Sequence, residues 1–347
     1  MPTTYAIPDG RVAMNASIWT GDGVTPKAVV SNLAFQPDFL WLKQRSAINY
    51  HFLQNSIAGA TKYLASNATD AESSGSSGGW IQSFDSNGYT TVTGASNSNN
   101  VNGSGITYVG WAWKAGGTAV SNTAGTITSS VSANTTAGFS VVTYTGTGAN
   151  ATVGHGLGVA PSFIVIKGRD TGYDWRVYHT SVGNTSALFL NTTSASVANS
   201  TYWNNTSPTS SVFSVGSNAG MNGSTNTYVA YCFAPVAGYS AFGSYTGNGS
   251  SDGPFVYTGF RPRFVLVKSS TAAQSWQMYD STRNPSNEVN CTLFANGTNA
   301  ESTSNGNFDF LSNGFKLRNG DFAINKSAET YIYYAVAENP FKFSNAR

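Results

Sequence analysis

The chain has 347 residues, a length that suits two or three domains. Only 10% of the residues are charged, the formal net charge is +2, and the basic residues are scattered, so the basic stripe that nucleic-acid binding requires is missing. Aromatic residues reach 13%, which excludes a disordered polymer, because disordered chains are poor in aromatic side chains.

Membrane insertion and export by a signal peptide are not expected either. No apolar run approaches the roughly 18 residues that a spanning segment needs. The N-terminus has no basic stretch followed by an apolar one, so the sequence predicts no secretory signal.

Residues 1–14 precede the first repeated module. They contain Pro2, Pro8 and the apolar side chains of Tyr5, Ile7 and Val12. We expect this N-terminal arm to lie extended, to add to the edge of a partner's sheet and so to attach the protein to a larger assembly.

The first repeated motif is Trp19-Thr20-Gly21-Asp22-Gly23. It recurs as Tyr144-Thr145-Gly146-Thr147-Gly148 and as Tyr245-Thr246-Gly247-Asn248-Gly249, at offsets of 125 and 101 residues. Glycine reaches the positive φ angles of tight turns, so the Thr-Gly-x-Gly part predicts a turn.

The second motif is an apolar, β-branched run that starts at proline, with strands expected at 37–43, 161–167 and 262–268. Its offsets of 124 and 101 residues nearly equal those of the first motif, which establishes an internal repeat. A run such as Phe163 to Ile166 is typical of a central strand buried on both faces.

Two further motifs keep the same register. Asn49-Tyr50-His51-Phe52 is aligned with Asp174-Trp175-Arg176-Val177 and Ser275-Trp276-Gln277-Met278. Each copy closes with an aromatic segment, which starts at Tyr108, Tyr228 or Tyr331. An aromatic residue that recurs in all copies is expected to lie in the core.

These motifs predict an all-β chain of three tandem β-sandwich modules, of jelly-roll or lectin-like type, with helix in at most a few per cent of residues. The expected modules are 15–116, 138–236 and 237–347. Residues 117–137 are almost all Gly, Ser, Thr, Ala and Asn. We interpret them as an extended linker, with room for one strand around Gly125 to Val131.

The repeated motifs resemble a module that is common in tail-fibre and minor structural (tail) proteins of marine and other tailed bacteriophages. The resemblance rests on YTGTGANATVGHGLGVAPSFIVIKGR, GSYTGNGSSDGPFVYTGFRPRFVLVK and the ending YIYYAVAENPFKFSNAR, with FQPDFLWLKQRS and YVGWAWKAGG in the first copy. It implies a virion structural protein that is made in the cytoplasm of the host bacterium, and it assigns no catalytic or binding residue.

Three functions follow in order of preference. The first is a tail-fibre or tail-tip component that contacts the host surface, with the tail favoured over the capsid surface. The second is a capsid decoration or head-fibre protein. The third is a polysaccharide depolymerase, which needs two carboxylates across a cleft; Asp70 and Glu72 are the closest pair, and acidic residues do not recur between copies. We therefore expect no enzyme activity.

No cofactor or metal is expected. His51, His155 and His179 have no neighbouring ligands at metal spacing, and we interpret them as structural. Asp22 and Asp252 each offer one carboxylate in a glycine-rich loop, which is weak for calcium. Cys232 and Cys291 are expected to be buried small hydrophobic residues.

The candidate ligand-binding residues are Trp203, Tyr202 and Trp80, aromatic residues that do not recur and that lie among Gly, Ser and Asn. An exposed aromatic ring can stack on a sugar. The expected partners are a host surface glycan or protein, other virion proteins through the arm, and copies of the same chain. The uncharged surface can pack against copies of itself without burying unpaired charges, and the resemblance to fibrous phage appendages implies a homotrimer.

Overall fold

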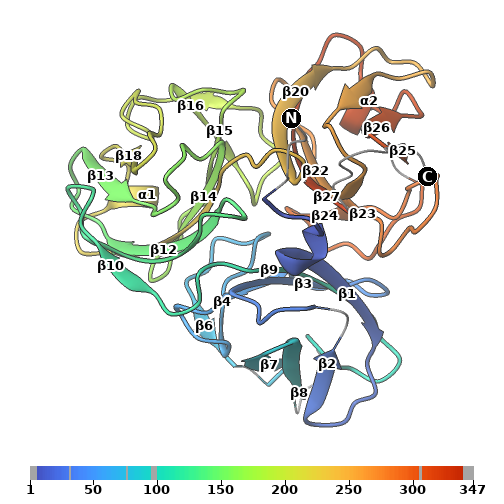
Figure 1. The fold of residues 1–347 in the computed structure, drawn as a ribbon, viewed down its shortest axis with the longest axis horizontal. Helices are drawn as coiled ribbons and strands as arrows, with labels where there is room; N and C mark the ends of the chain where they lie inside the picture. Colours follow the sequence, from blue (N-terminus) through green and yellow to red (C-terminus); the bar gives the residue numbers. More distant parts are fainter. Residues whose placement is uncertain (1–5, 31–32, 76, 95–99, 305–306, 339–347) are drawn as a thin grey trace.

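The computed structural model describes residues 6–30, 33–75, 77–94, 100–304 and 307–338. Strands account for 43% of the chain and helices for 3%, which confirms the all-β prediction. The strands fall into three groups that appear as three lobes around a common centre (Figure 1). We call them copy 1 (strands β1–β9), copy 2 (β10–β19) and copy 3 (β20–β27).

Copy 1 consists of a four-stranded sheet in the order β1-β9-β3-β4, a three-stranded sheet β2-β8-β7 and a small β5-β6 pair. A short 3-10 helix at Gly10–Val12 precedes it. Its strands are β1 (Met14–Thr20), β2 (Lys27–Val30), β3 (Phe39–Gln44), β4 (Phe52–Asn55), β5 (Lys62–Tyr63), β6 (Ser73–Ser74), β7 (Gly79–Asp85), β8 (Gly88–Thr93) and β9 (Thr107–Trp113).

Copy 2 has an eight-stranded sheet in the order β10-β11-β12-β19-β14-β15-β16-β17 and a separate pair, β13-β18. One helix, α1 (Ala219–Asn222), precedes its last strand. Its strands are β10 (Val120–Asn122), β11 (Ser129–Asn134), β12 (Phe139–Thr145), β13 (Ala151–Gly154), β14 (Phe163–Gly168), β15 (Arg176–His179), β16 (Ser186–Phe189), β17 (Val197–Ala198), β18 (Val212–Val215) and β19 (Thr227–Phe233).

Copy 3 has a five-stranded sheet, β20-β27-β22-β23-β24, and a three-stranded sheet, β21-β26-β25. Its helix is α2 (Phe322–Asn325). Its strands are β20 (Ser240–Thr246), β21 (Phe255–Tyr257), β22 (Pro262–Ser269), β23 (Gln277–Asp280), β24 (Leu293–Phe294), β25 (Phe308–Leu311), β26 (Gly314–Leu317) and β27 (Thr330–Ala337).

The main sheets share one antiparallel strand order, namely β1-β9-β3-β4, β12-β19-β14-β15 and β20-β27-β22-β23. The predicted apolar runs are β3, β14 and β22, and every residue of these three strands is buried. One face of each main sheet packs on the smaller sheet of its own copy. In copy 1, for example, Leu40 and Leu42 share a cluster with Ile81 and Tyr89.

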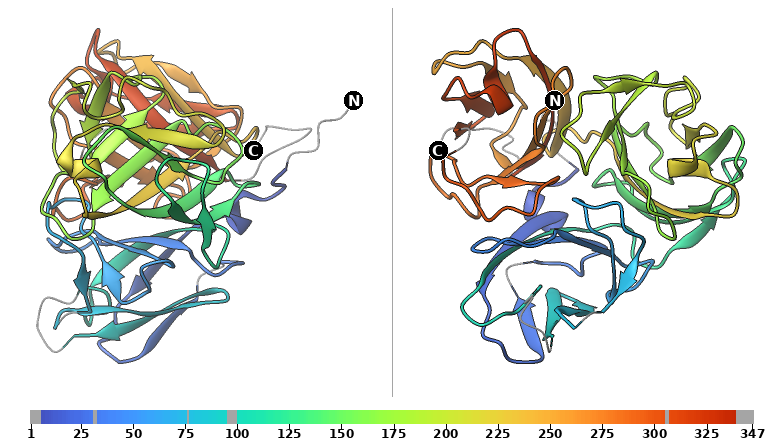
Figure 2. Two further views of the ribbon diagram at one scale, coloured as in Figure 1. Left: turned by 90° about the vertical axis from the view of Figure 1, so that its left-hand side faces the viewer. Right: turned by 180° about the vertical axis from the view of Figure 1, so that it is seen from behind.

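The other faces of the main sheets meet at the centre of the molecule. A single hydrophobic cluster joins Phe39 and Trp113 of copy 1, Phe163 of copy 2, and Phe264 and Tyr334 of copy 3. The view from behind shows the same three lobes around this centre (Figure 2). The three copies therefore form a closed ring in which each copy contacts the other two, an arrangement that the repeats alone did not reveal.

Two sequence interpretations are corrected. Residues 117–137 are not an extended linker, because β10 and β11 lie within them and β11 pairs with β12 along Ser130–Asn134.

The described part of the N-terminal arm is not free to join a partner's sheet. Ile7 and Met14 are buried in the central cluster of their own chain, and residues 1–5 lie outside the described residues.

Candidate functional site

The aromatic residues of the first motif and of the closing segment pack in the cores of their copies, as predicted, with Trp19 partly buried. In each copy the ring of the first motif stacks on the tyrosine that opens the closing segment. The stacked pairs are Trp19–Tyr108, Tyr144–Tyr228 and Tyr245–Tyr331, with ring centroids 5.1, 5.2 and 5.2 Å apart. These pairs stabilise the modules and are not available to a ligand.

The predicted alignment of Tyr50 with Trp175 is wrong by one residue. Strand pairing places Phe52 opposite Leu42 and Arg176 opposite Ile166, so His51 is the equivalent of Trp175 and Trp276. His51 is buried, whereas the side chain of Tyr50 is 46% exposed. The shared aromatic character of Tyr50 and Trp175 caused the error.

The residue at this position lies against the neighbouring copy in every case. The Trp175 indole N–H donates to the backbone oxygen of Ala65 in copy 1 (2.9 Å). The Trp276 indole donates to the backbone oxygen of Phe189 in copy 2 (2.8 Å). The ring of His51 lies beside the backbone of Phe294 in copy 3, and its burial lowers its pKa well below the ordinary range.

Backbone bonds between the copies follow the same cyclic order. In each copy, the backbone oxygen of the residue directly after the central buried strand accepts an N–H group of another copy. These acceptor residues are Arg45, Arg169 and Ser270. The donors are Glu301, Glu72 and Ser196 respectively, at 2.7, 2.6 and 3.0 Å. We call these three contacts the seams of the ring.

Two of the seams carry an ion pair as well. The Arg169 guanidinium donates two hydrogen bonds to the Glu72 carboxylate (2.9 and 2.8 Å), and Arg45 does the same to Glu301 (3.0 and 2.7 Å). Arg283 also donates to Glu301 at 2.9 Å. The carboxylate of Glu72, considered above as half of a catalytic pair, is thus committed to holding copies 1 and 2 together.

The other histidines are structural as well. The His179 Nδ1 atom accepts the N–H of Ser181 (3.1 Å), so its Nε2 atom carries the proton and donates to the backbone oxygen of Tyr333 (3.1 Å). Burial lowers the pKa of His179 to about 4. His155 accepts the N–H of Leu157 (3.2 Å) and donates to the Thr209 oxygen (3.1 Å).

Nothing in the described part of the chain resembles a metal centre, since it holds no group of three or more His, Cys, Asp or Glu side chains placed to bind one. The Asp22 carboxylate accepts from Lys27 (2.6 Å) and from the Asn102 amide (2.9 Å), and Asp252 pairs with Lys316 (2.7 Å). Cys232 and Cys291 are free and buried.

The structure places two of the three candidate ligand-binding aromatics differently from the prediction. Trp203 is 1% exposed and donates its indole N–H to the Ser186 oxygen (3.0 Å), and Tyr202 is 6% exposed. Both belong to the core of copy 2, which corrects the prediction that they contact a ligand. Trp80 is partly exposed on β7, and its role in binding stays a prediction.

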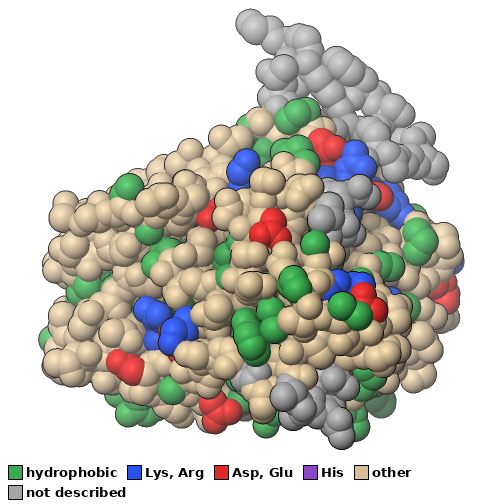
Figure 3. Space-filling model, turned by 90° about the horizontal axis from the view of Figure 1, so that it is seen from below, with side chains coloured by type: hydrophobic (Ala, Val, Ile, Leu, Met, Phe, Trp, Pro, Cys, Tyr) green, Lys and Arg blue, Asp and Glu red, His purple; other side chains and the backbone are tan. Residues whose placement is uncertain are grey.

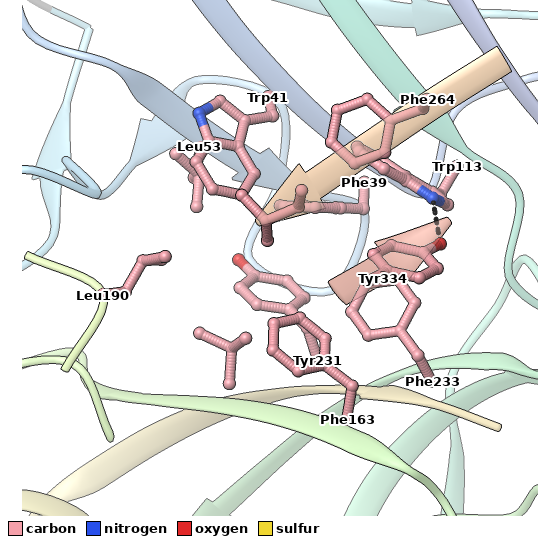
Figure 4. A pocket seen from close by; sticks show the side chains of 12 residues that line it. Phe39, Trp41, Leu53, Trp113, Phe163, Leu190, Tyr231, Phe233, Phe264 and Tyr334 are labelled. Carbon is pink, nitrogen blue, oxygen red and sulfur yellow. Dashed lines mark hydrogen bonds between the residues drawn. The ribbon is translucent and has the colours of Figure 1, made fainter. Parts of the chain in front are cut away.

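The centre of the ring is not a ligand site. Side chains of all three copies point toward one another there, and the Trp113 indole N–H donates to the Tyr334 hydroxyl at 3.0 Å (Figure 4). The remaining cavity has a volume of about 20 Å³ and is lined by apolar and aromatic side chains. A space of this size holds about one water molecule.

Among the described residues, three surface clefts remain as candidates. One of them, of about 380 Å³, lies on copy 2 and is lined mostly by serine and threonine side chains. The other two are lined by residues between 34 and 119. The larger, of about 830 Å³, lies beside Asp38 and residues 114–119. The Asp38 carboxylate is already engaged in hydrogen bonds within the chain. It accepts the N–H groups of Ala115 (2.7 Å) and Gly117 (3.4 Å) and the hydroxyl group of Ser56 (2.8 Å). The smaller, of about 310 Å³, lies on copy 1. It has aromatic walls and a polar rim, so it is the best candidate for a binding site. We call it the copy 1 cleft.

The surface around these sites is mostly uncharged. On the face shown in Figure 3, Lys, Arg, Asp and Glu side chains are scattered and no single-sign patch forms. None of the helices in the described residues is long and apolar enough to span a membrane.

Neither a curated protein nor a solved structure matches this chain. One family does, and its match covers residues 11–340, which includes all three copies and all three seams. The chain belongs to the family described as Domain of unknown function (DUF7483).

Proposed function

We propose that this protein is a structural component of a bacteriophage virion, and that it acts at the tail as a fibre or tip protein that contacts the host surface. The observation that carries the proposal is the closed ring of three β-sandwich copies. Its buried His51 and His179 lie at contacts between copies, and its Glu72 and Glu301 carboxylates pair with arginines of another copy, so the chain offers a rigid scaffold with neutral outer loops. Such a scaffold is suited to display and adhesion.

The resemblance of the repeated motifs to phage tail modules supports the same proposal. A low-charge surface rich in Ser, Thr, Asn and Gly can pack against other virion subunits without burying unpaired charges. We propose that attachment by the N-terminal arm concerns residues 1–5, because Ile7, Ala13 and Met14 are buried in the central cluster.

Localisation in the particle tests the proposal. Phage particles would be purified by density gradient and analysed by mass spectrometry, and an antibody to this protein would be located by immunogold electron microscopy. Gold at the tail is the expected result. Gold over the capsid would favour the decoration protein, and absence from purified particles would overturn both.

Two solution experiments test the other parts of the proposal. Sedimentation equilibrium at micromolar concentration is expected to give a trimer, and a stable monomer would contradict it. Incubation with polysaccharide from the host surface is expected to release no reducing ends. Release by the wild-type protein would favour the depolymerase.

A further inference from the structure

The copy 1 cleft is walled by aromatic side chains. Tyr50 is exposed at its mouth, and Phe52 and Tyr63 form an edge-to-face pair inside it with ring centroids 5.2 Å apart. The cleft volume of about 310 Å³ is near the lower end of the range of ligand sites, about 300–1,000 Å³. It therefore suits a ligand of one or two rings.

Copy 2 fills the equivalent space with its own side chains. Strand pairing places Leu53 beside Leu64 in copy 1 and Val177 beside Leu188 in copy 2, so the next residues, Ala65 and Phe189, are equivalent. In copy 2 the Arg176 guanidinium lies 4.7 Å from the ring centroid of Phe189 and 5.3 Å from that of Tyr202.

The same position is also aromatic in copy 3. Met278 pairs with Leu293 there, which makes Phe294 the equivalent of Ala65. In copy 1, alanine replaces this ring, and the sequence from 73 to 79, ahead of Trp80, consists of serine and glycine. The cleft is open because copy 1 lacks the side chains that fill copy 2.

The rim of the cleft carries amides and a carboxylate. The Asn49 side-chain amide donates to the side-chain oxygen of Asn100 at 3.2 Å, and Asp70 lies exposed beside them. No lysine or arginine is among the described residues that line the cleft. Amide and carboxylate groups can exchange hydrogen bonds with several hydroxyl groups, whereas Asp70 disfavours an anionic ligand.

We infer that the copy 1 cleft binds a neutral sugar residue of a surface glycan. One face of the sugar ring packs on Tyr50 and Tyr63, and its hydroxyl groups bond to Asn49, Asn100 and Asp70. This inference rests on the proposed role at the host surface, because it names the chemical class of the receptor.

Binding of simple sugars to the full-length protein tests the inference. Galactose, glucose, mannose and N-acetylglucosamine would each be examined by saturation-transfer NMR and titration calorimetry, with N-acetylneuraminic acid as an anionic comparison. At least one neutral sugar is expected to bind with a Kd of about 1 mM or below. No binding of any neutral sugar at about 10 mM would overturn the inference, as would a preference for the anionic sugar.

Variants locate the site. Ala65→Phe introduces the ring that copies 2 and 3 have and is expected to abolish binding. Tyr50→Ala, at an exposed position that should not affect folding, is expected to weaken binding at least tenfold. Tyr257→Ala removes an exposed ring of copy 3 and serves as the matched control. Unchanged affinity of Tyr50→Ala would place the sugar elsewhere and refute the assignment.

The two proposals can fail separately. A protein that is found in virions but binds no neutral sugar retains its structural role and loses the sugar site. A protein that binds sugar through the cleft but is absent from virions retains the site and loses the proposed location.

Discussion

Lys43, Lys167 and Lys268 occupy the same position at the ends of the central buried strands, and their side chains are fully buried. Each ammonium group donates to two backbone oxygens of the turn that follows, those one and four residues later. For Lys167 the acceptors are Gly168 (2.9 Å) and Thr171 (2.8 Å). Burial lowers the pKa of the three lysines to about 7, 8 and 7 respectively, because water no longer solvates the charge.

Because of these lowered pKa values, we expect an unusual dependence of the free energy of unfolding on pH. Between about pH 7 and pH 10 the unfolded chain holds the lysine protons and the folded chain releases them, so the free energy of unfolding should increase with pH. Above about pH 10 the free energy of unfolding should fall. Burial raises the pKa of tyrosines such as Tyr108, to about 12, so these side chains lose their protons in the unfolded chain while they keep them in the folded chain.

Urea unfolding at a series of pH values measures this effect. The Lys167→Met variant should show a smaller increase between pH 7 and pH 10 than the wild-type protein. A wild-type stability that is constant or decreasing over this range would show that the lysines remain charged in the fold.

Trp203 belongs to the core, and its replacement should reveal this directly. Trp203→Ala removes a ring that packs edge-to-face on Tyr178, with ring centroids 5.5 Å apart, and leaves a cavity in copy 2. We expect the free energy of unfolding to fall by about 3–5 kcal/mol. The exposed Tyr173 is the control, because Tyr173→Ala should change it by less than about 0.5 kcal/mol. Equal small effects in both variants would contradict the core assignment.

At the scale of the elements, the glycine turn of the first motif is built in the same way in every copy. The N–H groups of Gly23, Gly148 and Gly249 donate to the backbone oxygens of Asn102, Asn222 and Asn325, at 3.1, 2.7 and 2.8 Å. The glycines have φ angles of +72°, +76° and +69°. This geometry confirms the turn that the sequence predicts.

The first glycine of the motif is required for a different reason. A Cβ atom on Gly146 would lie 2.3 Å from the backbone oxygen of Gly223, too close for any side chain. Gly146→Ala should therefore lower the free energy of unfolding by about 1–3 kcal/mol. Gly172→Ala is the matched control, because its Cβ atom would lie 3.8 Å from the nearest atom, the Thr69 oxygen. Thermal denaturation of both variants would measure the difference, and similar melting temperatures would refute the steric argument.

The central strands and the turns could be predicted because their signals are local. The run from Phe163 to Ile166 has no polar residue, and burial on both faces follows from that alone. The sequence predicts strand β11 only in part, as a single strand around Gly125 to Val131, whereas the structure has it at Ser129–Asn134. Its Ser-rich sequence has little apolar content, and it is a strand because β12 offers a free edge next to it.

The site was harder to predict than the fold for a physical reason. Tyr202 and Trp203 lie in a polar segment, which suggested exposure. In the fold, Arg176 and Phe189 pack on Tyr202, and Tyr178 packs on Trp203, all from distant positions in the sequence. The copy 1 cleft is present because position 65 is alanine, whereas the equivalent position is phenylalanine in the other two copies. A single small residue forms no motif that could be recognised in the sequence. A comparison of the three copies in the corrected register of His51 and Trp175 would have drawn attention to position 65.

At the scale of the whole molecule, the three seams differ in strength. Two of them contain an Arg–Glu pair. In the seam of copies 2 and 3, the described residues at the equivalent positions are Ser196 and Ser270, which a backbone hydrogen bond joins. When one partner of a partly buried ion pair is replaced by an uncharged residue, the remaining charge has no opposite charge nearby to stabilise it.

Glu72→Gln should therefore lower the free energy of unfolding by about 1–3 kcal/mol, because the Arg169 guanidinium loses its carboxylate. The control is Asp309→Asn in copy 3. Its partner Arg318 is 41% exposed and can be solvated when the carboxylate is lost, so a change below about 1 kcal/mol is expected. Both would be measured by urea unfolding. A loss for Asp309→Asn as large as that for Glu72→Gln would show that the seam pair has no special role.

Covalent fusion of three similar modules into one ring frees each module from symmetry. In a ring of three identical subunits, one amino-acid change appears three times, so a cleft that opens in one subunit opens in all of them. Here the position occupied by Phe189 and Phe294 is free to be alanine in copy 1 alone, while the other two copies keep their packing and the common core stays closed. One copy can diverge toward recognition while its two neighbours preserve the stability of the whole.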